Sequence, residues 1–287
     1  MGDSNFITDI IYENGPVKVL YEDNHIIAVE KPAGILSQGD NSGAEDLLTL
    51  IKKDVAKRKN KPGDAFIGLV HRLDRNTGGV MVFAKTSKAA ARLSEQLRGK
   101  QLKKCYFALA EGRLDVPEGT VLRDRLSKDE KSNRVFRSRD GRECVLLVSP
   151  LAFDGKYTLT AASPVTGRTH QIRAQLALAG HPLAGDTKYG GREIVKRDGE
   201  VFLGLWSGLL SLRHPVKQEQ MTFARCPGGR DAGYWGFDGK IFADSLAKMQ
   251  ALAGIAAEDD SKRTDGIAAE DDSKRTDGIA AEGDGGI

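Results

Sequence analysis

The order of strand-like and helix-like patterns along the chain constrains its fold more than any other feature. β-Branched and apolar runs predict strands at 17–21, 25–30, 78–85, 103–112, 143–153 and 157–164, with a strand–turn–strand unit over 208–226. Amphipathic spacing predicts helices at 45–58, 86–99 and 170–180. These elements are interspersed without a steady strand–helix–strand rhythm, which favours the α+β class. The chain is therefore expected to form a mixed, mostly antiparallel sheet with flanking helices and loops.

Two of the helix predictions rest on apolar spacing and on end signals. Leu47 and Ile51 lie on one face of the first helix, at the spacing of one helical turn. Thr86 or Ser87 is the predicted N-cap of the second helix, and Gly99 is its predicted C-cap. No shift in composition divides residues 17–250, so this stretch is expected to be a single domain after an N-terminal extension over 1–16.

Composition limits the classes of protein to which this chain can belong. Its 287 residues are 40% hydrophobic and 29% charged, which is typical of a soluble globular chain. No apolar run approaches the roughly 20 residues of a membrane helix, and the N-terminus lacks the basic flank of a secretory signal. Cys105, Cys144 and Cys226 are too far apart for a metal site or a disulfide framework. These features predict a cytoplasmic protein with no membrane partner.

The net charge of +3 hides an uneven distribution. From residue 254 onward a 12-residue acidic unit repeats, and this tail over 254–287 carries ten acids and four bases. Residues 1–253 therefore hold 39 Lys and Arg against 30 Asp and Glu, a surplus of nine positive charges. A basic body suits binding to a polyanion, although ordinary surface charge for solubility gives the same count. The tail has too few large apolar residues to order itself and is predicted to be disordered.

A carboxylate between two guanidinium groups marks the segment HRLDRNTGGVMVFAK at 71–85. Asp74 stands between Arg72 and Arg75, just before a glycine pair and a strongly apolar strand. Neighbouring positive charge favours the ionised form, which suits a nucleophile or an electrostatic stabiliser. An Asp at the entrance of a strand is also a common turn former, and this segment alone leaves both interpretations open.

A second polar cluster lies in TGRTHQIRAQLALAGHPLAGDTKYG at 166–190. Its chemistry-bearing residues are Arg168, His170, Gln171, Arg173, His181, Asp186, Lys188 and Tyr189. The two histidines lack the spacing of a zinc site, so no metal is predicted. Arg173, near the start of a predicted helix, offers a rigid fork that could hold a nucleophilic Asp ionised and oriented.

Several motifs together resemble one family. HRLDRNTGG, KKCYFALAEG, TGRTHQIR and GHPLAGDTKYG occur in the order of the signature motifs of the RluA-type RNA pseudouridine synthases. The opening VLYEDNHIIAVEKPAGI is similar to the N-terminal strands and KPAG loop of that family, and LRHPV resembles its C-terminal strand motif. The likeness spans residues 17–225, most of the predicted domain, and implies a pseudouridine-synthase-like catalytic domain.

The resemblance implies roles for individual residues. Asp74 matches the catalytic aspartate that attacks the target uridine, and Tyr106 matches the tyrosine that stacks on the base and takes a proton. Arg173 matches the arginine that pairs with the aspartate. Arg72 matches the arginine that enters the space left by a flipped-out nucleotide. The predicted RNA contacts are Arg72, Arg75, Lys104, Arg168 and His170.

The implied activity is isomerisation of uridine in structured RNA, either ribosomal or transfer RNA, by a monomer that needs no cofactor and no protein partner. About sixteen residues precede the first family-like strand, so the S4-like RNA-binding domain of many relatives is not expected. Target choice would then fall to the body, including a basic loop predicted over 123–139. Two alternatives stay open: an RNA-binding or chaperone role that needs no catalysis, and a hydrolase with Asp186 as a distant second acid.

Overall fold

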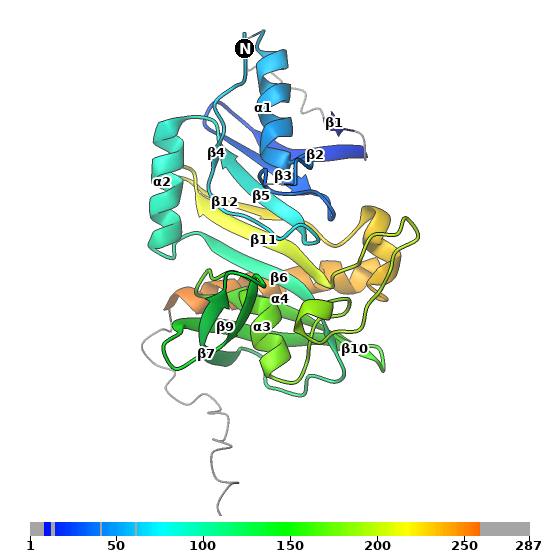
Figure 1. The fold of residues 1–287 in the computed structure, drawn as a ribbon. Helices are drawn as coiled ribbons and strands as arrows, with labels where there is room; N and C mark the ends of the chain where they lie inside the picture. Colours follow the sequence, from blue (N-terminus) through cyan, green and yellow to red (C-terminus); the bar gives the residue numbers. More distant parts are fainter. Residues whose placement is uncertain (1–8, 13–14, 41, 61, 259–287) are drawn as a thin grey trace, which may run out of the picture.

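The computed structural model describes residues 9–12, 15–40, 42–60 and 62–258, and it shows one long twisted sheet with helices against both faces (Figure 1). The strands are β1 Ile10–Tyr12, β2 Gly15–Glu22, β3 Ile26–Lys31, β4 Gly68–Leu69, β5 Gly78–Ala84, β6 Lys103–Glu111, β7 Thr120–Asp129, β8 Arg134–Arg137, β9 Arg142–Phe153, β10 Tyr157–Pro164, β11 Leu205–Arg213 and β12 Gln220–Ala224. The helices are α1 Leu47–Arg58, α2 Ser87–Arg98, α3 Gln171–Leu178 and α4 Gly239–Glu258, with 3-10 turns at η1 Thr187–Tyr189 and η2 Gly229–Tyr234.

The twelve described strands follow the order β1-β2-β3-β5-β11-β6-β10-β9-β7-β8, with β4 added at β5 and β12 at β11. The pair β5–β11, in the middle of the sheet, is parallel, whereas the other described strand pairs are antiparallel. The prediction of an α+β fold on a mixed, mostly antiparallel sheet is confirmed.

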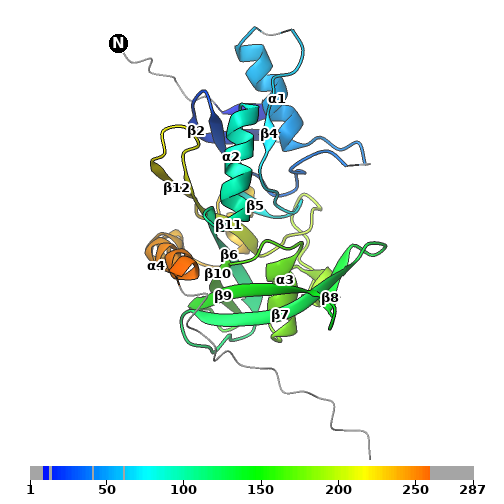
Figure 2. The same cartoon turned by 90° about the vertical axis from the view of Figure 1, so that its left-hand side faces the viewer.

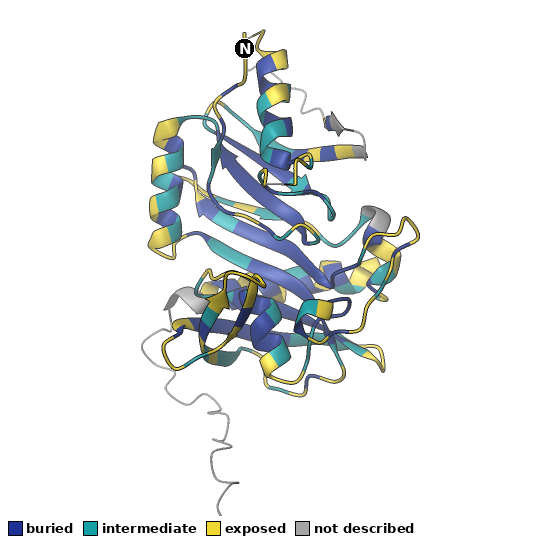
Figure 3. Cartoon of the chain, in the orientation of Figure 1, coloured by how far each residue is buried: buried dark blue, intermediate teal, exposed yellow. Residues whose placement is uncertain are grey.

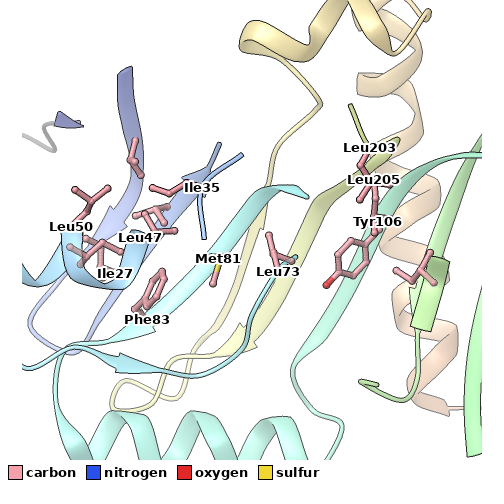
Figure 4. Close-up of a cluster of buried hydrophobic side chains, with 14 of the residues drawn as sticks. Ile27, Ile35, Leu47, Leu50, Leu73, Met81, Phe83, Tyr106, Leu203 and Leu205 are labelled. Atoms are coloured by element: carbon pink, nitrogen blue, oxygen red, sulfur yellow. The ribbon is translucent and has the colours of Figure 1, made fainter. Parts of the chain in front are cut away.

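Each face of the sheet carries two helices. The core on one side joins α1 and α3 to side chains such as Met81 and Phe83 of β5 and Tyr106 of β6 (Figure 4). On the opposite side α2 packs against the alternate side chains of β5, such as Val80 and Val82. On that side α4 packs over Phe107 of β6 and Trp206 of β11. Because both faces are covered, β5 is buried along its whole length, which explains its unbroken apolar sequence (Figure 3).

The local signals that predicted the helices hold in the structure. Thr86 caps α2 by accepting a hydrogen bond from the Ala89 N–H at 3.1 Å, and Gly99 follows its last residue. At α1 the cap is Asp46, which accepts from the Thr49 N–H at 3.0 Å. The predicted strands of the core and the helix at 170–180 also occur, each within a few residues of the expected bounds.

The prediction of a loop over 123–139 is wrong. This segment contains most of β7 and all of β8, which pair as a hairpin and project beside α3 (Figure 2). Two apolar residues of this polar segment face inward: Leu126 and Val135 are buried in one cluster with Ala174 of α3 and Tyr189. The remaining side chains of the hairpin are mostly charged and exposed, which is why the segment resembles a loop in composition.

Helix α4 was not predicted from the sequence. It begins at Gly239 and ends at Glu258, so the first residues assigned to the acidic tail are helical. The remainder of the tail, for which disorder was predicted, lies outside the described residues. At the other end, β1 falls within the segment assigned to an N-terminal extension and pairs with β2. Among the described residues no helix has both the length and the apolar character needed to cross a membrane.

Candidate active site

A short clamp fixes the backbone just before Asp74. The Ser37 hydroxyl donates to the Leu73 carbonyl at 2.7 Å and accepts from the Leu73 N–H at 3.1 Å. The Thr77 N–H then donates to the Asp74 carbonyl at 3.0 Å, which closes a turn directly before β5. Ser37 comes from the loop after the KPAG sequence, where the sequence showed no chemistry. Its contacts are with backbone atoms far along the chain, and local patterns do not reveal such contacts.

The KPAG loop supports the same turn from the other side. The fully buried ammonium of Lys31 donates to the carbonyls of Pro32, Arg75 and Thr77 at 2.8–3.0 Å. Burial lowers the pKa of Lys31 to about 7. The Gly34 N–H donates to the Arg75 carbonyl, and the Arg75 Nε donates back to the Gly34 carbonyl, both at 2.9 Å. The loop that carries Asp74 is therefore held at several points by the single stretch 31–37.

The glycine pair after Asp74 is needed for strand packing. Gly78 and Gly79 begin β5, where it runs parallel to β11. Gly79 has φ +112, and a Cβ there would lie 2.3 Å from the Ser207 carbonyl oxygen. A Cβ on Gly78 would lie 2.4 Å from the Trp206 ring. A residue with a Cβ at either position would displace β11. The glycines therefore allow the start of β5, directly after the Asp74 turn, to pair closely with β11.

The cation that meets Asp74 is Arg173, on the first turn of α3. Its Nη1 donates to Asp74 Oδ2 at 2.8 Å, while its Nε and Nη2 donate to the two oxygens of Asp186 at 2.7 and 2.8 Å. The bidentate fork therefore binds Asp186, which is buried, and leaves one nitrogen for Asp74. Although burial opposes it, the two carboxylates raise the pKa of Arg173, so the guanidinium stays charged.

A histidine also faces Asp74. His170 Nε2 lies 3.7 Å from Asp74 Oδ2, and the side chain of His170 is 8% exposed. The other ring nitrogen, Nδ1, lies 2.9 Å from the Tyr189 hydroxyl, which accepts from the Val135 N–H of β8 at 2.8 Å. Burial lowers the pKa of His170, and the charge of Arg173 adds to this effect against the opposing Asp74 carboxylate.

Tyr106 lies on the same face of the sheet as α3. It packs in one core cluster with Leu73, the neighbour of Asp74 (Figure 4). Burial raises the pKa of Tyr106, and the negative charge of Asp74 raises it further, against a hydrogen bond with Ser207. The tyrosine is thus neutral and within the electrostatic reach of the carboxylate. This arrangement unites the three residues that were predicted to be catalytic.

Arg72 and Arg75 flank Asp74 in sequence, and their positive charge was expected to favour its ionised form, but they are not its contact partners in the described residues. In the described chain the ion pairs of Asp74 are with Arg173 and His170, and not with Arg72 or Arg75. Both flanking side chains are exposed, and Arg75 is tied to the KPAG loop. In an extended or turning segment, side chains adjacent in sequence point apart, so the partner comes from a distant element.

The other predicted RNA contacts have different surroundings. Arg168 is exposed, two residues before His170. Lys104 is half-buried on β6, two residues before Tyr106 and so on the same face, and burial lowers the pKa of its ammonium group. Its Nζ lies next to Gly167, in the loop that leads to α3. The His170 ring instead faces Asp74, which favours a role beside that carboxylate over a role as a surface contact for RNA.

The site combines an oriented anion, a permanently charged arginine and a neutral tyrosine. This set suits attack on an electrophilic carbon and transfer of a proton at an aromatic hydroxyl. Among the described residues no three His, Cys, Asp or Glu side chains are grouped so that they could hold a metal ion. In the sequence Asp186 was considered only as a distant second acid of a hydrolase, and Tyr189 had no role. In the structure they contact Arg173 and His170.

Comparisons with known proteins agree with this description. Residues 25–178 match the family model for RNA pseudouridylate synthase. A Haemophilus influenzae protein named ribosomal large subunit pseudouridine synthase C is 37% identical over 216 residues, covering 72% of this chain and 64% of that protein. A Bacillus subtilis protein, YhcT, named as an uncharacterized RNA pseudouridine synthase, is 38% identical over 217 residues, covering 74% of this chain and 69% of that protein.

Solved structures support the fold. The human protein RNA Pseudouridylate Synthase Domain Containing 1 superposes with a TM-score of 0.61 at 18% identity, covering 82% of this chain and 94% of that one. The human protein RNA Pseudouridylate Synthase Domain Containing 4 gives a TM-score of 0.57 at 24% identity, covering 81% of this chain and 92% of that one. One family model matches more than half of the sequence, and relatives 37% and 38% identical cover 72% and 74% of the chain. This chain belongs to the RNA pseudouridylate synthase family.

Proposed function

We propose that this protein converts specific uridines in structured RNA to pseudouridine, with Asp74 as the nucleophile. The observation that carries the proposal is the Arg173–Asp74 contact of 2.8 Å, next to a buried tyrosine on the same face of the sheet. Relatives named as ribosomal large subunit pseudouridine synthases support the reaction class and favour ribosomal RNA as the substrate. Transfer RNA is the other candidate.

The reaction needs one glycosidic bond to break and another to form. The N1–C1′ bond is broken, the uracil turns, and C1′ is joined to C5; C5 then loses a proton and N1 gains one, so that the atoms balance. An anion close to C1′ can stabilise or trap the sugar while the base is detached. Arg173 keeps that anion oriented, and the Tyr106 ring offers a surface for the loose base and a hydroxyl for proton transfer.

The target base must leave its stack before Asp74 can reach C1′. Enzymes that act on a base inside structured nucleic acid extrude it, at a cost of a few kcal/mol. Arg72 is exposed and two residues from Asp74, so we assign it to the gap left by the extruded nucleotide. Arg75 and Arg168, also exposed, are assigned to the phosphates around that gap.

A larger basic surface extends along the β7–β8 hairpin. Its positive side chains are Arg123, Arg125, Lys128, Lys131, Arg134, Arg137 and Arg139. Some are paired, as Arg137 is with Asp124 at 2.6 Å, whereas Lys131 in the turn of the hairpin and Arg139 just after β8 are exposed. Phosphate contacts at such a surface are the main source of affinity for RNA. The hairpin is therefore the proposed arm that holds the substrate beside α3.

We assign the protein to the cytoplasm as a monomer that acts without a protein partner. Free cysteines at three separate positions suit a reducing compartment. Sedimentation of the purified protein, alone and with RNA, tests the monomer assignment. A stable dimer would contradict it.

The activity is tested by mapping pseudouridine chemically in cells with and without the gene. Modified positions should disappear with the gene and return with the wild-type copy, but not with an Asp74→Ala copy. Asp115→Ala, at an exposed aspartate, is the control that should restore them. If Asp74→Ala restores modification at the wild-type level, the proposal is wrong. If it restores growth without modification, the RNA-binding or chaperone role replaces catalysis as the main function.

A further inference from the structure

One feature of the site has no place in the proposed reaction, namely the buried contact between His170 and Tyr189. His170 stands immediately before α3 with φ +51, a left-handed conformation that is uncommon for residues other than glycine. A residue at this position usually caps the helix with its side chain, but His170 makes no such bond. Strained backbone that serves no capping role points to a constraint on the side chain.

The contacts of Tyr189 bear on which ring nitrogen of His170 carries the proton. The Tyr189 hydroxyl accepts the Val135 N–H at 2.8 Å, and its own proton can be donated to His170 Nδ1 at 2.9 Å. A ring nitrogen that accepts a hydrogen bond is bare in the neutral imidazole, so the proton is placed on Nε2. Nε2 is the nitrogen that faces Asp74 Oδ2 at 3.7 Å.

Burial lowers the pKa of His170 and so favours this neutral state, while charges of both signs face the ring. Asp74 faces it from the turn before β5, and Arg173 faces it from α3. Asp186 and Lys188 act on it from the segment around η1. Tyr189 also lies edge-on to the imidazole, with ring centroids 5.7 Å apart, and below the Arg173 guanidinium, 5.2 Å from its ring centre. The imidazole therefore has few alternative orientations.

We propose that Tyr189 fixes the tautomer of His170 so that its Nε2–H faces the Asp74 carboxylate, which makes His170 and Tyr189 positioning residues for the nucleophile. Because the Tyr189 hydroxyl is held by the backbone of β8, the same chain of contacts links the RNA-holding hairpin to Asp74. The inference rests on the proposed function for its kinetic consequence. Its structural part, the tautomer, does not depend on any activity.

The tautomer is read directly by NMR of the full chain labelled with 15N-histidine, because protonated and bare ring nitrogens have well-separated shifts. Wild-type His170 should show a protonated Nε2 and a bare Nδ1. Tyr189→Phe should lose this preference, whereas Tyr234→Phe should keep it. Tyr234 is the matched control, since its hydroxyl also accepts a backbone N–H, from Arg197 at 2.9 Å. A protonated Nδ1 in the wild type, or no change in Tyr189→Phe, would overturn the proposal.

Single-turnover kinetics test the link to catalysis. Loss of an orienting partner commonly lowers activity about 10- to 100-fold, and Tyr189→Phe should lower the rate of pseudouridine formation by that amount with RNA affinity unchanged. His170→Gln places an amide N–H where Nε2–H stood and has no tautomer to choose. In that background Tyr189→Phe should change the rate less than about twofold, by the logic of a double-mutant cycle.

Equal losses from Tyr189→Phe in both backgrounds, or an equal loss in Tyr234→Phe, would show a general structural effect and overturn the kinetic part. If Tyr189→Phe does not fold, His170→Gln alone tests the proposal, because the His170→Gln variant should retain most of the wild-type rate. A rate for His170→Gln as low as that of His170→Ala would count against the proposal. Wild-type protein that makes no pseudouridine while its NMR tautomer is as stated would refute the proposed function and leave the tautomer assignment standing.

Discussion

At the level of single residues, the orientation of Arg173 depends on two carboxylates rather than one. Asp186 takes two of its nitrogens and Asp74 takes one, so the guanidinium plane is set by Asp186. A planar fork with both of its edges occupied has little freedom to rotate. The direction of the remaining N–H toward Asp74 therefore follows from Asp186, a buried residue.

Replacing Asp186 by Asn should consequently weaken catalysis more than binding. Asp186→Asn keeps the shape but removes the charge that anchors Arg173, and we expect the single-turnover rate to fall by about 10- to 100-fold with RNA affinity within about twofold. Asp231→Asn is the control, because Asp231 is also a buried carboxylate in an ion pair, with Lys196 at 3.1 Å. Equal losses in the two variants would show that the effect is one of general stability.

Lys31 makes stability depend on pH in a predictable direction. Its pKa is about 7 in the folded protein and near 10.5 when unfolded, so the unfolded chain binds more protons between these values. The free energy of unfolding of the wild type should thus rise with pH from 7 to 10, relative to Lys31→Met. Urea unfolding at several pH values measures this difference. If the stability of the wild type and of Lys31→Met changes with pH in parallel, the assignment is contradicted. The control is Lys240→Met at an exposed lysine, whose stability should change with pH in parallel with that of the wild type.

Sequence reasoning located part of the site, and the missing part has a physical cause. Asp74 and Arg173 stood out because their chemistry is carried by charged side chains within recognisable motifs. Arg173 was considered as the cation for Asp74 from its chemistry and from the likeness to a family, although nothing in the sequence around Asp74 pointed to it. Ser37 was missed because its role is a pair of bonds to one backbone unit.

At the level of elements, the start of β5 is the position where the sequence tolerates least change. Gly79→Ala should destabilise the protein through two effects, a left-handed φ and a Cβ pressed against the Ser207 carbonyl. Gly155→Ala isolates the first effect, since Gly155 has φ +97 but open space around it. We expect Gly155→Ala to cost about 1–2 kcal/mol and Gly79→Ala clearly more. Equal shifts in denaturant midpoint would show that the contact with β11 is not tight.

The hairpin β7–β8 should account for part of the salt dependence of RNA binding. Lys131→Gln with Arg139→Gln removes two exposed charges, one from the hairpin turn and one just after β8. If both contact phosphates, the slope of log affinity against log salt should fall by about 0.7 to 0.9 for each. The control, Lys240→Gln with Lys248→Gln on α4, should leave the slope unchanged because α4 covers the opposite face of the sheet from α3. An equal change in the control pair would indicate long-range charge rather than contact.

The elements that sequence patterns predicted well are those with two packed faces or a clear amphipathic stripe. β5 and α2 are such elements. The hairpin was missed because only Leu126 and Val135 of its outer part are buried, too few to show an alternating pattern. Helix α4 was not predicted, and its last turn shares sequence with the acidic repeats that follow, which assigned those residues to the tail.

At the level of the whole molecule, the sheet brings together segments that are distant in sequence. The turn at Asp74 precedes a central strand, Tyr106 lies on β6 beyond β11, and α3 packs Arg173 against that same face. The KPAG loop and the hairpin reach the site from opposite ends of the sheet. The order of strand and helix patterns could predict the class of fold, but this convergence depends on a strand order in which β11 separates β5 from β6.

The rate of pseudouridine formation by purified Asp74→Asn, measured in a single turnover with the mapped RNA, tests the central claim most directly. RNA affinity and thermal stability are measured in parallel, so that a loss of binding or of fold is detected separately. The account predicts wild-type affinity with no pseudouridine above the background of protein-free RNA. Conversion at a rate within about tenfold of wild type would contradict it, because a neutral amide cannot replace the attacking carboxylate.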